Sequence, residues 1–369
     1  MDPLWRTVGS VRITHISDCF APRTGGIETQ VLGLARAQHR VGDQVRVITA
    51  TSGPPFTEFP VDRLSFPVPF DLPLHPRTYR GVKRLLSDNP PEVVHVHAGV
   101  LSPFAWSATR AAHDLGLPTL VTIHSVWGQI ARPMFGISGA WLKWNRVAMS
   151  AVSDVAADHM RASLGVDIDV VPNGIDPSLW ARTGVADWKA TPLQLVSVLR
   201  IAPRKRTGAL LHVMRDVKKL GVDAYLNIVG DGPERVMWEK KARQEHLPVT
   251  FLGRLAPAEL KSVLDRSQVF IQPSTKESFG IAALEARANG LAVVARRGTG
   301  TQTFIADGVD GCICNSDTGI ASAIKDWDTD RTSLQAILEH NARIEPNFSW
   351  SEIDDRVRAA YQRAIAKAQ

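Results

Sequence analysis

Residues 274–286 read STKESFGIAALEA and directly follow the apolar run VFIQP at 269–273. A short apolar run of this kind predicts a buried strand, and the alanine-rich sequence after Gly280 predicts a helix. The polar residues between them would lie at the carboxyl end of a strand, where open parallel sheets bind their ligands. The stretch therefore predicts an α/β sheet with a ligand site at this strand end.

An anion fits this predicted site. If the helix begins near Phe279 or Gly280, the N–H groups of its first turn favour a phosphate, and the glycine lets a ligand approach the backbone closely. Glu277 would stand just before the helix and Glu285 within it. Because carboxylates accept strong hydrogen bonds from hydroxyl groups, the pair suits a sugar nucleotide. A capping role for Glu277 and a solvated Glu285 would explain the same two residues.

Short apolar runs alternate with helical stretches along the chain, which is typical of parallel sheets built from βαβ units. The predicted strands are 11–17, 44–50, 93–98, 119–124, 149–153 and 169–172, followed by 193–199, 225–229, 249–252, 269–272 and 291–295. With 369 residues the chain is long for one core, and the Gly and Pro residues of 173–192 indicate a hinge. We therefore expect an α/β protein with two Rossmann-like domains facing a cleft, 1–173 and 174–349.

Composition indicates a globular protein with an anionic partner. The chain is 44% hydrophobic and 22% charged, with a net charge of +6 and a pI of about 9.4. This charge favours a nucleotide, a phospholipid surface or nucleic acid as partner, but no zinc-finger spacing or aromatic-basic motif supports nucleic acid. No run reaches the roughly 18 apolar residues of a membrane span, and the start MDPLWR lacks a signal peptide's apolar stretch. We expect a cytoplasmic protein.

Two cations follow the first strand of the second series. Arg200 stands at its end and Lys205 comes five residues later. The two side chains can close on a diphosphate whose negative charge grows as a sugar leaves. A solvated basic loop is the alternative, and it fits the neighbouring Arg204 and Arg206.

A pair of glycines, Gly25 and Gly26, follows the first strand of the chain and precedes a helical run. Paired glycines allow a helix N-terminus to approach a phosphate, although a Gly-Gly pair is also a common turn. No G-x-G-x-x-G motif follows this strand, which argues against a NAD-binding site.

Three histidines lie on or at the end of predicted strands. His95 and His97 alternate with valines, so both face one side of a strand and are expected to be buried polar residues near the cleft. Such a pair can bind a metal, but no third ligand is apparent, and the three cysteines indicate no metal set; we expect no metal site. His124 ends the strand 119–124 and therefore lies at the crevice edge.

These motifs resemble those of family-four retaining glycosyltransferases, which have the GT-B fold, and the resemblance runs over nearly the whole chain. The E-x7-E signature of that family matches Glu277 and Glu285. The resemblance implies a retaining, metal-independent hexosyltransferase without a cofactor. Its donor would be a GDP- or UDP-linked sugar, with mannose slightly favoured, and its acceptor a glycan, a lipid or a small molecule.

The resemblance also implies a role for individual residues. Glu277 and His124 would contact the transferred sugar, and Glu285 would hold the ribose. The residues that would contact or border the donor diphosphate and base are Arg200, Lys205, Gly25, Gly26, Phe279, Gly280, Ile281, Gly253 and Arg254. The N-terminal domain would bind the acceptor, with the terminal helix, 350–369, packing back on it, and the C-terminal domain would bind the donor.

Three positions depart from the family pattern. Ser125 follows His124 where an aspartate is common, while Thr299 replaces a glycine and Thr303 a glutamate. The last two changes suggest an altered pocket beside the E-x7-E region. Two alternatives therefore stay open: a sugar-nucleotide 2-epimerase on the same fold, and a catalytically inactive nucleotide-sugar-binding protein.

Two basic stretches, 75–87 and 129–146, mix arginine and lysine with apolar residues. Helices of this composition can lie on an anionic bilayer, or they can cover a core and leave a solvated face. Because several family members act on lipid acceptors, the resemblance keeps peripheral contact with an anionic membrane open beside the core-covering role.

Overall fold

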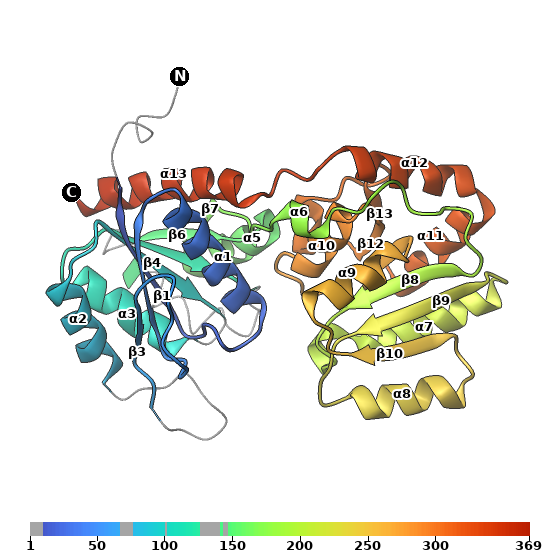
Figure 1. Ribbon diagram of the computed structural model, residues 1–369, viewed down its shortest axis with the longest axis horizontal. Helices are drawn as coiled ribbons and strands as arrows, with labels where there is room; N and C mark the ends of the chain where they lie inside the picture. Colours follow the sequence, from blue (N-terminus) through green and yellow to red (C-terminus); the bar gives the residue numbers. More distant parts are fainter. Residues whose placement is uncertain (1–9, 67–76, 100–101, 126–140, 143–146) are drawn as a thin grey trace. The chain divides into compact units, whose positions relative to one another are not determined.

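The computed structural model describes residues 10–66, 77–99, 102–125, 141–142 and 147–369. By its internal contacts the chain forms two compact units, which are described one at a time (Figure 1). The N-terminal unit consists of Met1–Gly174 together with Phe348–Gln369, and the C-terminal unit is Ile175–Asn347.

The N-terminal unit is built on a parallel sheet of seven strands in the order β3-β2-β1-β4-β5-β6-β7. Its strands are β1 (Arg12–Ser17), β2 (Gln44–Thr49), β3 (Val61–Arg63), β4 (Val93–Ala98), β5 (Thr119–Ile123), β6 (Ala148–Ala151) and β7 (Asp169–Val170). Its helices are α1 (Gly26–Arg40), α2 (Thr78–Asp88), α3 (Pro103–His113), α5 (Asp154–Leu164) and α13 (Trp350–Ala368).

The two faces of this sheet differ because successive side chains of a strand point to opposite sides. On β1 and β4, Ile16, Val94 and Val96 join the apolar core that also contains residues of α3. The residues between them, His15, His95 and His97, face the layer of α1 and α13, which contact each other. Figure 1 shows α13, in red, running beside this part of the unit.

The C-terminal unit contains a second parallel sheet of six strands in the order β10-β9-β8-β11-β12-β13. Its strands are β8 (Leu193–Val198), β9 (Ala224–Val229), β10 (Val249–Gly253), β11 (Val269–Gln272), β12 (Ala292–Arg296) and β13 (Gly311–Cys314). Its helical segments are α6 (Pro177–Trp180), η4 (Pro203–Lys205), α7 (Thr207–Lys219), α8 (Arg235–Gln244), α9 (Pro257–Asp265), α10 (Ile281–Ala288), η5 (Gly300–Thr303), α11 (Asp317–Thr329) and α12 (Arg331–Arg343).

Each sheet has one place where the order of the strands reverses. In the N-terminal sheet it lies between β1 and β4, and in the C-terminal sheet between β8 and β11. The loops that leave two such strands run to opposite sides and open a crevice, which is where α/β sheets bind ligands. Each sheet thus offers one crevice at the carboxyl ends of its central strands.

The segment predicted as a hinge, 173–192, is largely part of the C-terminal unit. Its short helix α6 contacts α10, and the amide of Asn289 donates a hydrogen bond to Trp180 O at 2.7 Å. Further on, Arg331 donates to the carbonyl oxygen of Trp188 at 3.2 Å. From residue 175 onward this segment is therefore held against the C-terminal unit by its own contacts.

Of the two predicted basic helices, one is described. In α2, Val82 and Leu86 are buried in the core, while Arg80 and Arg84 are exposed, so the helix covers the core with its apolar face. The second stretch, 129–146, lies outside the described residues except for 141–142. Among the described residues, no helix combines the length and apolar character of a membrane span.

Candidate active site

The crevice of the C-terminal sheet brings together the two most specific motifs of the sequence. Strands β8 and β11 are neighbours, with Leu195 paired to Val269. The loop after β8 carries Lys205, and the loop after β11 carries Glu277. Lys205 Nζ lies 2.6 Å from Glu277 Oε2. A predicted phosphate-binding cation and a predicted sugar-binding carboxylate thus form an ion pair.

Glu277 is held in place by two other contacts besides its ion pair. Gln272 Nε2 lies 3.5 Å from the same carboxylate oxygen. The Gly300 amide donates to the Glu277 carbonyl oxygen at 2.9 Å, which joins two loops of the unit through their backbones. Gly280 lies close by, since a Cβ atom added to it would lie 3.5 Å from Glu277 Cγ. The side chain is nearly buried, with 11% of its surface exposed, so the carboxylate has little freedom to move.

The helix after this loop begins slightly later than predicted. α10 starts at Ile281, with Gly280 as its N-cap in the left-handed region at φ 98°. Phe279 lies before the cap, and its ring is buried against Phe304 at a centroid distance of 5.2 Å. The first-turn amides that can face an anion therefore begin at Ile281. Phe279 holds the loop in place from the core side.

Glu285 lies within α10, eight residues after Glu277, as the sequence indicated. Its residue is half-buried, and burial raises the pKa of the Glu285 carboxyl to about 8. At neutral pH this carboxyl is therefore largely protonated in the unliganded protein. A ligand that donates hydrogen bonds to it would favour the ionised form.

Arg200 is exposed at the end of β8, and two glycines of the next loop fix the backbone beside it. An added Cβ atom on Gly230 would lie 1.9 Å from Leu199 O, and one on Gly232 would lie 2.2 Å from Ile201 O. The Ile201 amide also donates to Asp231 O at 3.0 Å. The turn formed by Gly230, Asp231, Gly232 and Pro233 thus packs directly on the segment that presents Arg200.

The expectation that Arg206 belongs to a solvated basic loop is wrong. Its guanidinium donates to both carboxylate oxygens of Asp317, at 3.0 and 2.7 Å, and to Pro273 O at 2.8 Å. Arg296 pairs with the same carboxylate. Arg206 therefore ties the Lys205 loop to the end of β11 and the start of α11. Its neighbour Arg204 is exposed.

The glycines predicted beside the diphosphate and base occupy loop ends. Gly253 ends β10 at φ 75°, and the next residue, Arg254, is exposed. In the N-terminal unit, Gly25 is the N-cap of α1 and Gly26 its first residue. An added Cβ atom on Gly25 would lie 2.4 Å from a carboxylate oxygen of Glu28. A charged side chain that the sequence reasoning did not consider thus lies at this helix start.

The two threonines that depart from the family pattern lie in the loop beside α10. Thr299 is fully buried and donates a hydrogen bond to Arg296 O at 2.8 Å, whereas Thr303 is half-buried in η5. Between them, Thr301 is also fully buried, and an added Cβ atom on Gly280 would lie 2.9 Å from its Oγ1. This loop therefore comes close to the start of α10 through Thr301, while the hydroxyl of Thr299 bonds within its own loop.

In the N-terminal unit His124 directly follows the carboxyl end of β5, and its amide donates to Ala98 O at 2.9 Å. Its ring nitrogens are turned into the protein: Nε2 lies 3.1 Å from His97 Nδ1, Nδ1 is buried, and the Asn173 side chain interacts with the same ring. Burial lowers the pKa of His124 to about 4, so the ring is neutral at physiological pH.

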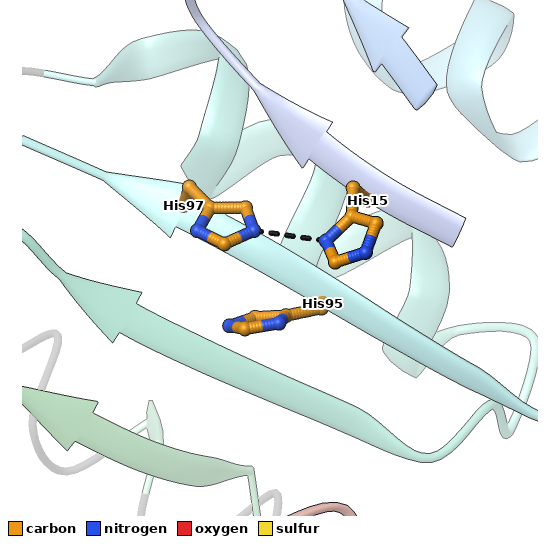
Figure 2. Close-up of side chains that lie close together, drawn as sticks. All are labelled: His15, His95 and His97. Carbon is orange, nitrogen blue, oxygen red and sulfur yellow. Dashed lines mark hydrogen bonds between the residues drawn. The ribbon is translucent and has the colours of Figure 1, made fainter. Parts of the chain in front are cut away.

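A third histidine, His15, lies beside His95 and His97, the pair noted in the sequence (Figure 2). Its Nδ1 lies 3.0 Å from His97 Nε2, and His95 packs on the His97 ring at a centroid distance of 4.0 Å. Burial lowers the pKa of His15 to about 4 and holds the pKa values of His95 and His97 well below their usual range. His95 and His97 are buried as predicted, and His15 is a third histidine beside them that was not apparent from the sequence.

Three neutral imidazoles this close could in principle hold a metal, because their nitrogens lie within 4.8 Å of one another. However, every ring nitrogen of the three already has a side-chain partner. His95, for example, lies between Tyr361 OH at 2.9 Å and Thr122 Oγ1 at 2.7 Å. A metal would have to replace these hydrogen bonds, so the geometry favours a hydrogen-bonded cluster over a metal centre.

Two protein families match this chain in sequence. "Glycosyltransferase Family 4" matches residues 24–179, and "Glycosyl transferases group 1" matches residues 184–345. An Arabidopsis thaliana component of phosphatidylinositol N-acetylglucosaminyltransferase is 24% identical, and the alignment covers 96% of this chain and 82% of the relative. Phosphatidyl-myo-inositol mannosyltransferase of Mycolicibacterium smegmatis is 27% identical, with 92% and 90% covered.

Solved structures share the fold over almost the whole length. Sucrose-phosphate synthase from Thermosynechococcus elongatus superposes with a TM-score of 0.76 at 19% identity, covering 96% of this chain and 99% of that one. Anabaena Alr3699/HepE in complex with UDP and glucose superposes with a TM-score of 0.74 at 17% identity, covering 94% and 98%. The chain therefore belongs to the family-four and group-one glycosyltransferases and has the GT-B fold.

Proposed function

We propose that this glycosyltransferase is a retaining, metal-independent hexosyltransferase that uses a nucleoside diphosphate sugar, with mannose as the favoured sugar. The observation that carries the proposal is the Lys205–Glu277 ion pair in the crevice of the C-terminal sheet, directly before α10. A cation and a helix N-terminus at one strand edge can stabilise a leaving diphosphate. The name of the mycobacterial mannosyltransferase supports mannose.

In the proposed reaction the bond between the anomeric carbon and the diphosphate oxygen breaks, and an acceptor hydroxyl forms its bond on the same face of the sugar. The hydroxyl proton passes to the departing diphosphate, so that no covalent enzyme intermediate is needed. Arg200 and Lys205 hold the growing negative charge, while Glu277 accepts hydrogen bonds from the sugar hydroxyls. Lys205 must then exchange its bond with Glu277 for one with phosphate.

The test is nucleotide release from a panel of GDP-, UDP- and ADP-sugars, with lipid and sugar acceptors present. We expect one donor to be used, and we expect Lys205→Ala and Glu277→Gln each to lower kcat about 100-fold or more, because both act on charge or contacts at the reacting sugar. The matched control is Lys276→Ala, which removes a lysine charge from an exposed position of the loop that carries Glu277. Its activity should stay near wild type.

Two results would contradict the proposal. One is the absence of nucleotide release from every donor, and the other is a product whose anomeric configuration, read by NMR, is opposite to that of the donor. The two alternatives drawn from the sequence, a 2-epimerase and an inactive binding protein, receive no support from the relatives named above.

We also propose a lipid-linked acceptor, reached by peripheral contact with an anionic membrane. Phosphatidylinositol is part of the names of two relatives, and α2 exposes Arg80 and Arg84 while its apolar side chains are buried. The contact would therefore be electrostatic, and cosedimentation with anionic vesicles should fall as salt rises. The double variant Arg80→Glu/Arg84→Glu should weaken it; equal cosedimentation with neutral vesicles would contradict the proposal.

A further inference from the structure

A continuous line of hydrogen bonds links α13 to His124 inside the N-terminal unit. Asp354 of α13 accepts from Gln38 Nε2 at 2.9 Å, and Gln38 Oε1 lies 2.8 Å from His15 Nε2. His15 Nδ1 lies 3.0 Å from His97 Nε2, and His97 Nδ1 lies 3.1 Å from His124 Nε2. We call Gln38, His15 and His97 the histidine row.

The α13 end of the line determines which atom donates and which accepts in each hydrogen bond. Asp354 is in an ion pair with Arg358 at 2.7 Å, and Arg358 also pairs with Asp43. The ionised Asp354 carboxylate can only accept hydrogen bonds, so the Gln38 amide must turn its NH₂ group toward it. The carbonyl oxygen of Gln38 then faces His15 and can only accept as well.

That direction propagates from ring to ring, because a neutral imidazole has one N–H donor and one acceptor nitrogen. His15 must carry its proton on Nε2, which leaves Nδ1 to accept from His97 Nε2. His97 Nδ1 in turn accepts from His124 Nε2. All three rings are therefore Nε2–H tautomers. Protonating His15 or His97 a second time would set two N–H groups against each other, at His15 Nδ1 or at His97 Nδ1.

We propose that α13 sets the tautomer and orientation of His124 through the histidine row, whose members thereby act as positioning residues for glycosyl transfer. The inference deepens the proposed function, because it rests on His124 lying at the transferred sugar. With both ring nitrogens of His124 turned inward, the row holds the ring and with it the main chain at the end of β5. The sugar would then meet a rigid, uncharged strand end.

The tautomers can be read in the wild-type protein. In protein labelled with ¹⁵N in the histidine rings, long-range ¹H–¹⁵N NMR separates the two tautomers by the shifts of the ring nitrogens. We expect His15, His97 and His124 all to carry the proton on Nε2, with the His124 signals identified by their loss in His124→Asn. An Nδ1–H tautomer at His124 would overturn the proposal.

The variant test compares Gln38→Met with Tyr361→Phe. Methionine removes the acceptor at the start of the row. Tyr361→Phe removes a hydroxyl that lies 2.9 Å from His95 Nδ1 and accepts from Gln38 Nε2 at 3.4 Å, but it removes none of the hydrogen bonds of the line itself. We expect Gln38→Met to change the His124 ring shifts and to lower kcat about 10- to 100-fold with little change in the donor KM. Tyr361→Phe should leave the tautomer of His124 as it is.

The outcomes separate this inference from the proposed function. If the ring-nitrogen shifts of His124 are unchanged in folded Gln38→Met, the row does not set the tautomer of His124. If the shifts change but kcat does not, the row has no positioning role in transfer. A fully active His124→Asn would overturn the proposed role of His124 in transfer, and with it the positioning role of the row. The tautomer measured in the wild-type protein needs no donor and would stand on its own.

Discussion

If Glu285 binds the donor ribose as proposed, donor binding should depend on pH. Its pKa is raised to about 8 by burial, and ribose hydroxyls that donate to it would favour the ionised form. Binding must therefore release a proton below pH 8, and the nucleotide Kd should rise by up to about tenfold for each pH unit below that value and level off above it. Calorimetry in two buffers of different ionisation enthalpy would measure the released proton.

Glu285→Gln provides the matched control, because it keeps the shape of the side chain and removes its titration. We expect weaker binding with no proton release between pH 6 and 8. A wild-type Kd that is flat over this range would show that Glu285 does not meet the ribose in its ionised form.

At the same scale, the sequence could identify residues but not their partners. The places of Glu277, Lys205 and Arg200 after predicted strands made them candidates, because a strand end on a parallel sheet is a ligand edge, and their predicted roles came from the family resemblance. The bond between Lys205 and Glu277 joins positions 72 apart in sequence, and only the order of β8 and β11 in the sheet brings them together. The Arg206–Asp317 pair, 111 apart, was missed for the same reason.

Among the elements, α10 depends on the glycine that starts it. Gly280 has φ 98°, and an added Cβ atom would lie 2.9 Å from Thr301 Oγ1. A left-handed backbone costs a residue with a Cβ atom about 1–2 kcal/mol. Gly280→Ala should therefore lower the free energy of unfolding by more than this amount, and it should lower kcat/KM. Gly308→Ala is the control, since Gly308 has φ 79° with nothing within 4 Å of the added atom. Equal losses of unfolding free energy in denaturant titrations would contradict this account of α10.

Strands were predicted well where they are buried and apolar. β4 and β11 have the predicted bounds, but two strands are absent from the predicted list: β13 (Gly311–Cys314), and β3 (Val61–Arg63), whose three half-buried residues carry no periodic signal. Alternation also showed that His95 and His97 share a face. It could not show that β1 brings His15 to the same place, since neighbouring strands are chosen by the topology of the whole sheet.

For the molecule as a whole, the two units have separate apolar cores, so we expect two unfolding transitions in calorimetry. Arg358 is buried between Asp43 and Asp354, with 10% of its side chain exposed. Arg358→Met leaves two buried carboxylates unpaired and should destabilise the N-terminal unit by about 3–5 kcal/mol. Arg356→Met, at an exposed position of the same helix, should cost less than about 1 kcal/mol. An equal shift of both transitions in Arg358→Met would contradict separate cores.

The return of α13 to the N-terminal unit has a consequence for synthesis on the ribosome. The C-terminal unit is a continuous stretch, Ile175–Asn347, whereas the N-terminal unit needs Phe348–Gln369 as well. The residues that emerge first must therefore wait for those that emerge after the C-terminal unit, which can already fold. Until then Gln38 and His95 lack the partners that Asp354 and Tyr361 provide, and the half that is made first is the half that is completed last.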